Sequence, residues 1–248
     1  MAILVTRAHP GNEATASNLR ARGYDVWLAP VLKFEPVAFR DEGEPGYKGI
    51  IVTSANAIRA IESRLQELRL LKLPLFAVGE ATGSAARAVG FAEVTVAGGD
   101  AEFLLETVLQ AVRDKVLKKK DTLLYLAGAE VSRDITPELR AAGLDVVRQT
   151  AYRMAPVKHL PRNVCDGFAA NGIEAVLHYS RRSALAFLEA TRSEGVEISA
   201  LAIPHCCLSE TIAGVLREAG AAQVAVAGSP DENALFGTLE RALRTRLA

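Results

Sequence analysis

Short apolar runs alternate along the chain with segments in which apolar residues recur at helical spacing. The apolar runs are typical of buried strands and the segments between them of amphipathic helices, so the pattern predicts parallel sheets covered by helices on both faces. Gly23, Gly90, Gly143 and Gly220 follow helical segments, where helices commonly end. We expect strands near residues 3–6, 25–29, 49–53, 75–78, 93–97, 122–126, 145–152, 174–179, 205–208 and 223–227.

The chain also contains its own near-copy. A repeat this long indicates duplicated domains, because the units of a solenoid are only ~20–50 residues long. The predicted fold class is therefore α/β, with two doubly wound parallel-sheet (flavodoxin-like) domains that arose by internal duplication. Three pairs of segments align without gaps: residues 3–37 with 123–157, 49–57 with 175–183, and 74–105 with 204–235.

Two proline-bearing segments occupy equivalent places after the second strand of each repeat, at 36–45 and 156–162. Proline lacks a backbone donor and restricts the residue before it, so both segments are predicted to be extended linkers. Two crossings at equivalent points would let the repeats exchange halves across a two-stranded linker. Domain 1 would then contain residues 1–35 plus 163–248, and domain 2 residues 46–155. The pattern equally allows two sequential domains.

Charge and composition narrow the function classes. Lys plus Arg and Asp plus Glu number 29 each, so no overall basic field predicts nucleic acid or a membrane surface as a partner. The chain reaches a charge too early for a signal peptide and has no apolar run of spanning length, so we expect a cytoplasmic protein. Cys165, Cys206 and Cys207 lack metal or redox spacing and are predicted to be buried small side chains.

The sequence points to neither a metal nor a nucleotide. The four histidines have no metal-ligand spacing, and His178 and His205 lie within predicted strands, where a structural role is favoured. A phosphate-binding loop of the Gly-x-x-x-x-Gly-Lys type is absent, and the glycines at 79–83 lack dinucleotide-binding spacing. We therefore expect no metal and no cofactor.

One apolar run ends abruptly in Thr53-Ser54-Ala55-Asn56, and its duplicate ends in Ser180 at the same place. A serine before a helix caps free backbone N–H groups. The same geometry presents those N–H groups to an anion at the carboxyl end of a strand. These residues alone do not decide between the two interpretations.

A series of short motifs follows the predicted strands along the chain: Val5-Thr6-Arg7, residues 51–57, residues 76–82, Leu124-Tyr125-Leu126-Ala127-Gly128 with Arg133 beyond it, Tyr152 before a proline linker, Tyr179-Ser180-Arg181-Arg182-Ser183, and residues 208–213. Taken in order, these motifs resemble the uroporphyrinogen-III synthase family over essentially the whole chain. The resemblance implies exchanged halves and a cofactor-free lyase that closes linear hydroxymethylbilane to uroporphyrinogen III, with loss of water and inversion of ring D. It also leaves room for a transient contact with hydroxymethylbilane synthase.

The substrate implied by this resemblance carries eight carboxylates, so a site built from strand-to-helix turns and arginines would suit it. At each position a plain capping or surface role is the competing interpretation. Ile212 departs from the family pattern, in which many members have a second hydroxyl after the threonine. The candidate substrate-binding residues are Arg7, Ser54, Asn56, Gly79, Thr82, Gly128, Arg133, Ser180, Ser183, Ser209 and Thr211.

Tyr152 is the candidate catalytic residue, because the matching tyrosine of the family is the best candidate for helping the ring A hydroxyl to leave. Its counterpart in the duplicate is Leu32, so the fold accepts an aliphatic side chain there. A tyrosine packed at a domain edge is the competing interpretation. The sequence predicts a monomer, and a two-lobed cytoplasmic sensor that binds a small molecule without catalysis is the alternative function.

Overall fold

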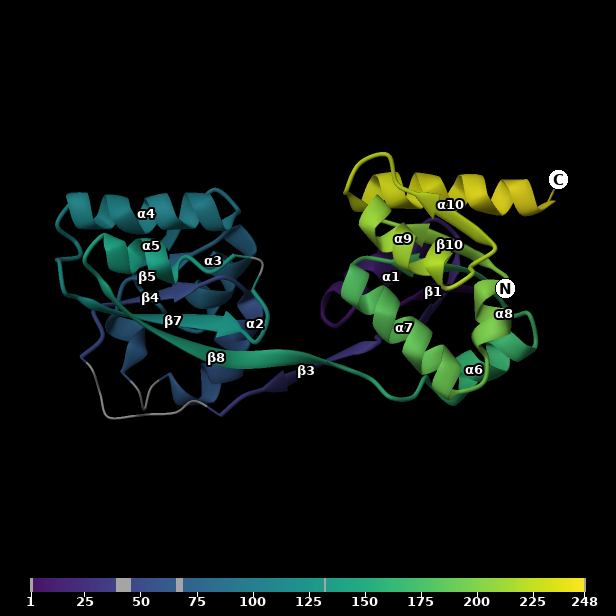
Figure 1. Cartoon of the computed structure of the whole chain (residues 1–248), viewed down its shortest axis with the longest axis horizontal. Coiled ribbons are helices and arrows are strands. Elements are labelled where there is room, and N and C mark those ends of the chain that lie inside the picture. Colours follow the sequence, from purple (N-terminus) through teal and green to yellow (C-terminus); the bar gives the residue numbers. More distant parts are fainter. Residues whose placement is uncertain (1, 39–45, 66–68, 132, 248) are drawn as a thin grey trace. The chain divides into compact units, whose positions relative to one another are not determined.

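The computed structural model describes residues 2–38, 46–65, 69–131 and 133–247. Contacts divide the chain into two compact units (Figure 1). Unit 1 combines both ends of the sequence, Met1–Lys33 and Ala155–Ala248, whereas unit 2 is the continuous segment Phe34–Met154. These divisions fall close to the predicted linkers, although residues 39–45 of the first linker lie outside the described residues.

Unit 1 holds a parallel sheet in the order β11-β10-β9-β1-β2. Helices α1 and α10 pack on one face of it, and helices α6, α7, α8 and α9 pack on the other. Its elements are β1 (Ala2–Val5), α1 (Gly11–Ala21), β2 (Asp25–Leu28), α6 (Arg162–Ala169), β9 (Ile173–His178), α7 (Arg181–Ser193), α8 (Glu197–Leu201), β10 (Pro204–Cys207), α9 (Glu210–Glu218), β11 (Gln223–Val226) and α10 (Glu232–Leu247).

Unit 2 holds a sheet in the order β3-β8-β7-β4-β5-β6. Helices α2 and α3 pack on one face, and α4 and α5 on the other. Its elements are β3 (Leu32–Pro36), β4 (Gly49–Val52), α2 (Ala55–Ile61), two 3-10 turns (Glu62–Arg64 and Leu70–Lys72), β5 (Leu75–Ala77), α3 (Glu80–Ala88), β6 (Val94–Val96), α4 (Ala101–Arg113), β7 (Thr122–Gly128), α5 (Thr136–Ala141) and β8 (Asp145–Pro156).

Apart from β3, the two sheets have the same strand order, with β7, β8, β4, β5 and β6 standing where unit 1 has β1, β2, β9, β10 and β11. Strands β1, β4 and β10 are buried along their whole length, as expected for parallel strands covered on both faces. The predicted α/β class with parallel, doubly wound sheets is confirmed. In both units the carboxyl ends of the parallel strands meet at one edge of the sheet.

All ten predicted strands are present, but the structure has an additional strand, β3, and β8 extends beyond its predicted end at residue 152. Val37 N–H donates to the Ala151 carbonyl at 2.8 Å, and Val157 N–H donates to the Val31 carbonyl at 2.9 Å. From Val31 to Val37 the hydrogen-bonded partner moves backwards along the chain, from Val157 to Ala151, so β3 and β8 are antiparallel. The prolines led to the prediction of linkers at this point, yet Pro36 and Pro156 are the last residues of these two strands. At the end of a strand, the backbone N–H that proline lacks removes little of the pairing between strands.

Candidate functional site

Unit 2 has a pocket of about 370 Å³ at the carboxyl edge of its sheet. It brings together four of the predicted site residues, Ser54, Gly128, Arg133 and Tyr152, which come from the ends of β4 and β7, the loop after β7, and β8. The edge of an open α/β sheet at which its strands end is where such folds bind ligands. The remaining lining residues are Thr53, Val78, Gly99, Asp100, Ala101, Tyr125, Glu130 and Val131.

Tyr152 lies within β8 rather than at its end, opposite Gly128 and beside a shift in the pairing of β7 with β8. Its ring stacks on Phe34 with centroids 5.7 Å apart. A Cβ placed on Gly128 would lie 2.9 Å from Tyr152 Cζ and 3.0 Å from its hydroxyl, so a larger residue at this position would displace the phenol. Within the described residues the hydroxyl of Tyr152 makes no hydrogen bond, so it is available to a ligand.

Tyr125 is a second phenol of this pocket, and the sequence analysis did not select it. It lies in the middle of the central strand β7, and the residue is fully buried. Its hydroxyl has no hydrogen-bond partner among the described residues. Burial raises the pKa of Tyr125; the nearby Thr53 hydroxyl acts against this shift but forms no well-aligned hydrogen bond with it.

Ser54 is the N-cap of α2, and its hydroxyl oxygen accepts a hydrogen bond from Asn56 N–H at 3.2 Å. The capping interpretation of the sequence is therefore correct locally, and the same side chain also lines the pocket. Asn56 donates from Nδ2 to the sulfur of Met154 at 3.9 Å and does not line the pocket.

Arg133 contributes the positive charge of the pocket lining. Its guanidinium lies 3.2 Å from Glu138 and 3.8 Å from Glu102, and 43% of the side chain remains exposed. Asp100 accepts hydrogen bonds from Glu102 N–H and Phe103 N–H at the start of α4, and Glu130 adds a second carboxylate to the lining. The lining is thus not strongly basic.

Gly79 and Thr82 begin α3 and do not line the pocket. Thr82 is only 5% exposed, and Gly79 packs against Gly99, whose φ of +108° requires a glycine. Thr82 is the counterpart of Ile212 in the duplicate, and Ile212 is also buried in its core. The side chain after Thr211 therefore packs inward, so the departure from the family pattern at Ile212 fills a core position.

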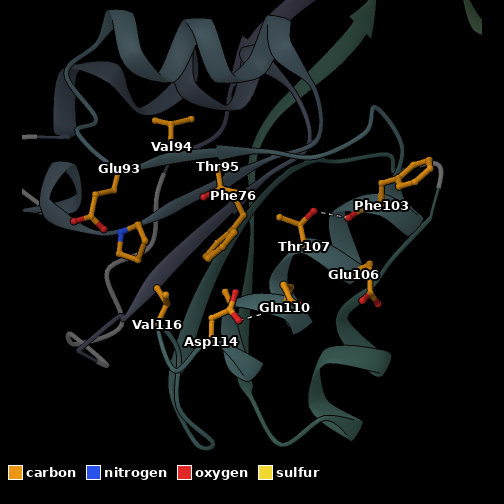
Figure 2. Close-up of a pocket in the computed structure, with 12 residues that line it drawn as sticks. Phe76, Glu93, Val94, Thr95, Phe103, Glu106, Thr107, Gln110, Asp114 and Val116 are labelled. Carbon is orange, nitrogen blue, oxygen red and sulfur yellow. Dashed lines mark hydrogen bonds between the residues drawn. The ribbon is translucent and has the colours of Figure 1, made fainter.

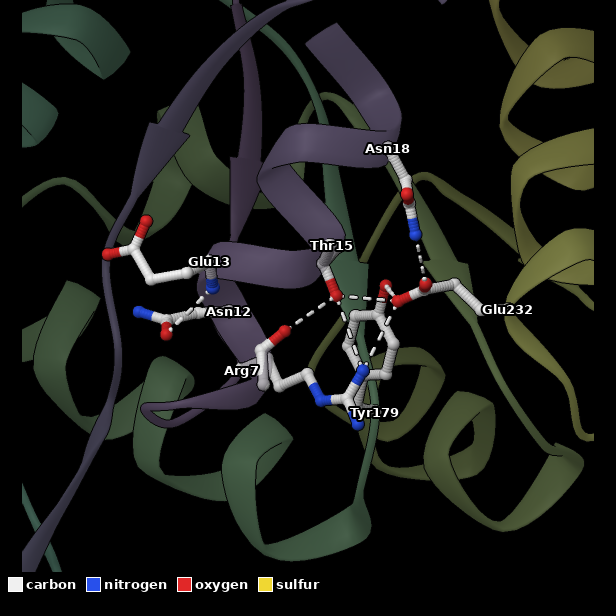
Figure 3. A network of polar contacts seen from close by, with 8 residues as sticks. Arg7, Asn12, Glu13, Thr15, Asn18, Tyr179 and Glu232 are labelled. Atoms are coloured by element: carbon white, nitrogen blue, oxygen red, sulfur yellow. Dashed lines mark hydrogen bonds and ion pairs between the residues drawn. The ribbon is translucent and has the colours of Figure 1, made fainter. Parts of the chain in front are cut away.

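In unit 1 the candidate Arg7 belongs to a network of polar side chains (Figure 3). Its Nη1 lies 3.2 Å from Glu232 Oε1 and donates to Thr15 Oγ1 at 3.3 Å, and its guanidinium lies over the ring of Tyr179. Glu232 also accepts from Thr15, Tyr179 and Asn18. Burial alone would raise the pKa of Glu232, but these donors and Arg7 outweigh it and hold the pKa below its usual range.

The serines and threonine predicted in unit 1 lie at helix starts. Ser180 and Ser183 form a reciprocal capping box at the start of α7, so each hydroxyl already serves a backbone N–H. Ser209 is the N-cap of α9 but makes no side-chain capping bond, and Thr211 is exposed in the first turn of the same helix. Among these four, Ser209 and Thr211 keep the more available hydroxyls.

His178 and His205 form a buried pair in unit 1. His205 Nε2 lies 3.0 Å from the Ala200 carbonyl, which fixes the proton on that nitrogen, and His178 Nε2 lies 3.0 Å from His205 Nδ1 and donates to it. Burial lowers the pKa of His205 to about 4 and that of His178 well below its usual value, so both are neutral. Burial also raises the pKa of Cys206 and Cys207 to about 12, which leaves both thiols protonated.

A larger groove of about 700 Å³ lies between α4 and the edge of the sheet in unit 2 (Figure 2). Phe76, Phe103 and Val116 give it an apolar lining. Two of its three acidic residues are paired, Glu106 with Arg113 and Asp114 with Gln110, and the third is Glu93. It offers no donor comparable to the phenols of the smaller pocket. Among the described residues, no group of three or more His, Cys, Asp or Glu side chains is placed to hold a metal, and no helix has the length and apolar character needed to cross a membrane.

Comparisons with known proteins give a consistent result. The family model described as "Uroporphyrinogen-III synthase HemD" matches residues 13–237. The crystal structure of uroporphyrinogen-III synthetase from Helicobacter pylori is similar, with 20% identity, 99% of each chain covered and a TM-score of 0.61. A mutant uroporphyrinogen III synthase from the extremely thermophilic bacterium Thermus thermophilus shares 17% identity over 99% of each chain, with a TM-score of 0.52. The search of curated proteins found no significant match.

Proposed function

This chain belongs to the uroporphyrinogen-III synthase family, and from that premise we propose which of its residues carry the reaction. The protein is a cyclising lyase of tetrapyrrole biosynthesis that converts hydroxymethylbilane to uroporphyrinogen III. In the reaction of this family, loss of the ring A hydroxyl leaves an azafulvenium cation, which ring D attacks at its substituted carbon. The spiro-pyrrolenine so formed fragments and recloses with ring D inverted. Holding one conformer of a substrate that also closes by itself is a large part of such catalysis.

Tyr152 is the residue that assists departure of the ring A hydroxyl. The observation that carries this assignment is the position of its phenol over Gly128 in the pocket of unit 2, with a hydroxyl that makes no hydrogen bond within the described residues. A neutral phenol donates a hydrogen bond to the leaving oxygen as negative charge develops there. No metal or cofactor enters this step.

The carboxylates of the substrate are bound by arginines, hydroxyls and backbone N–H groups at strand ends. Arg133 and Ser54 support this role by lining the pocket. In unit 1, Glu232 fixes one face of the Arg7 guanidinium, and that side chain remains 41% exposed. The other members of the proposed set are Asn56, Gly79, Thr82, Gly128, Ser180, Ser183, Ser209 and Thr211.

The cellular setting follows the same premise. The protein acts in the cytoplasm as a monomer and receives its unstable linear substrate through a transient contact with hydroxymethylbilane synthase. Size-exclusion chromatography with light scattering, alone and with that enzyme, measures both the oligomeric state and the contact.

The product isomer tests the proposed function. Freshly generated hydroxymethylbilane is incubated with the protein, and the products are oxidised and separated. Type III uroporphyrin is expected in excess over the type I isomer that forms without enzyme. If only the type I isomer forms, at the uncatalysed rate, while the protein still binds tetrapyrroles, the non-catalytic sensor becomes the better description.

A further inference from the structure

The hydroxyl of Tyr125 is an unusual group for the centre of a protein. The residue is fully buried in the central strand of unit 2, and its hydroxyl has no hydrogen-bond partner among the described residues. A buried hydroxyl without a partner destabilises the free protein, because water solvates the same group in the unfolded chain. Such a group needs an explanation in function or in an ordered water. Its place in the lining of the Tyr152 pocket supplies a functional one.

The internal duplication shows that packing does not require this phenol. Tyr125 aligns with Val5, which is fully buried at the corresponding place in β1 of unit 1. Tyr152 likewise aligns with Leu32. Unit 2 therefore has a phenol at two positions where the duplicate has an aliphatic side chain, and both phenols line one pocket.

We propose that Tyr125 is a second phenolic donor of the active site, which hydrogen-bonds the same departing ring A oxygen as Tyr152. The proposal rests on the proposed function of the protein. The charges of the pocket lining favour binding of the ring A end of the substrate in this pocket. Asp100 and Glu130 place carboxylates near the azafulvenium cation that forms when the hydroxyl leaves. Arg133, the cation of the lining, is paired with Glu102 and Glu138, and its side chain stays 43% exposed, which leaves it open to a carboxylate of the substrate.

The step balances without a proton from either phenol. The carbon–oxygen bond of the hydroxymethyl group breaks with its electron pair on the oxygen, and the two phenols stabilise the departing hydroxide by hydrogen bonds. The proton that ring D releases when it regains aromaticity at closure completes the water. Burial and the charge of Asp134 raise the pKa of Tyr125, which suits a group that donates a hydrogen bond and keeps its proton.

The test is Tyr125→Phe, which keeps the ring and removes only the hydroxyl. We expect kcat to fall about tenfold, KM to change less than threefold, and the melting temperature to stay the same or rise, because the unsatisfied hydroxyl is gone. Tyr24→Phe is the matched control, since Tyr24 lies in unit 1 and packs beside the helices of its core. Its turnover should remain within about twofold of wild type.

Turnover of Tyr125→Phe within about twofold of wild type would overturn the proposal, because the hydroxyl would then make no hydrogen bond that matters for departure of the ring A oxygen. A rise in KM with unchanged kcat would also overturn it, since the group would then bind a ground-state carboxylate. If both phenols donate to one oxygen, the fold loss of kcat in the double variant Tyr125→Phe, Tyr152→Phe should differ clearly from the product of the two single losses. Strictly multiplicative losses would contradict a shared oxygen.

The wild type distinguishes this proposal from the one on which it rests. If the wild type forms type III product and the Tyr125→Phe variant turns over equally fast, only the role of Tyr125 is overturned. Wild-type protein that forms no type III product would overturn the proposed function and the role of Tyr125 together.

Discussion

The two units share one scaffold and differ in what they do with the carboxyl edge of the sheet. In unit 1 several polar groups at this edge satisfy one another, since Glu232 accepts from Arg7, Thr15 and Tyr179, and Ser180 and Ser183 cap their own helix. In unit 2 the corresponding edge is a pocket with two phenols whose hydroxyls make no hydrogen bond to the described residues. The two copies of a duplicated fold can thus differ in how far the polar groups at this edge are satisfied within the protein.

The glutamate shared by the two copies shows how this difference arises. Glu232 at the start of α10 aligns with Glu102 in the first turn of α4. Glu232 is 26% exposed and is held by four donors, whereas Glu102 is 82% exposed and lies 3.8 Å from Arg133. The same residue type is thus a hydrogen-bonded, partly buried carboxylate in unit 1 and an exposed surface charge in unit 2.

Removing the hydroxyl of Tyr152 gives the largest expected effect. One hydrogen-bond donor to an oxygen that develops negative charge is typically worth ~10²–10³ in rate, so Tyr152→Phe should lower turnover at least tenfold while the melting temperature stays nearly unchanged. Initial rates of type III formation at saturating substrate measure it. Turnover within about twofold of wild type would mean that positioning alone carries catalysis and that the open edge of unit 2 is not a source of acid assistance.

Acid should weaken unit 1 through its buried histidine pair. Both pKa values are lowered in the folded state, so the stabilisation is complete above the unfolded pKa of ~6.5 and is lost as the pH falls from there towards about 4, where His205 becomes protonated. His205 alone should contribute on the order of 3 kcal/mol over this range. Urea unfolding at a series of pH values, followed by a probe in unit 1, measures the loss.

The duplicate supplies the control for this experiment, because Val52 and Leu75 occupy the aligned positions in unit 2. The double variant His178→Val, His205→Leu should flatten the dependence of unit 1 stability on pH between about 6.5 and about 4. A slope equal to that of wild type would assign the acid sensitivity to carboxylates instead.

Gly128→Ala should disturb the pocket without disturbing the fold. The added Cβ would lie 2.9 Å from Tyr152 Cζ, so the phenol must move, and a displaced donor should lower kcat about tenfold. Gly214→Ala is the matched control, because a Cβ there meets no neighbour and alanine favours a helix. Equal kinetics for the two variants would show that the contact between Gly128 and the phenol does not position Tyr152.

The smallest expected effect concerns the paired glutamates. Glu232→Gln should lower the free energy of unfolding by about 1 kcal/mol, because it weakens a hydrogen-bonded and partly buried carboxylate. Glu102→Gln at the aligned, exposed position should change it by less than about 0.5 kcal/mol. Denaturant unfolding of both variants measures the difference, and equal values would remove the contrast between a saturated edge and an open one.

The sequence predicted the strands and the fold class because buried parallel strands have a strong apolar pattern, and because the duplication supplied each pattern twice. It missed β3 because Pro36 and the polar residues Lys33 and Glu35 resemble a linker. Such an edge ribbon is specified by its pairing with β8, a partner more than a hundred residues away in the sequence. Local propensity carries no record of that pairing.

The candidate site was predicted in part. Ser54, Gly128 and Arg133 lie at or just beyond the ends of strands that share one edge of the sheet, so the pattern pointed towards them. Tyr152 was selected through the family resemblance, and it lies within β8. Tyr125 was missed because it lies inside an apolar run and looks like an ordinary core residue; its alignment with Val5 was the available signal. The bond between Arg7 and Glu232 spans 225 residues of sequence and left no local signal.

The insertion of unit 2 into unit 1 sets an order of events on the ribosome. Strands β1 and β2 emerge first, but β9, which pairs with β1, and β10 beyond it are made only after the whole of Phe34–Met154. Unit 2 is then complete in one stretch and free to fold during translation, whereas unit 1 waits for the last third of the chain. A premature stop codon near the end of the message would therefore ruin the half that was begun first and spare the half that holds both phenols.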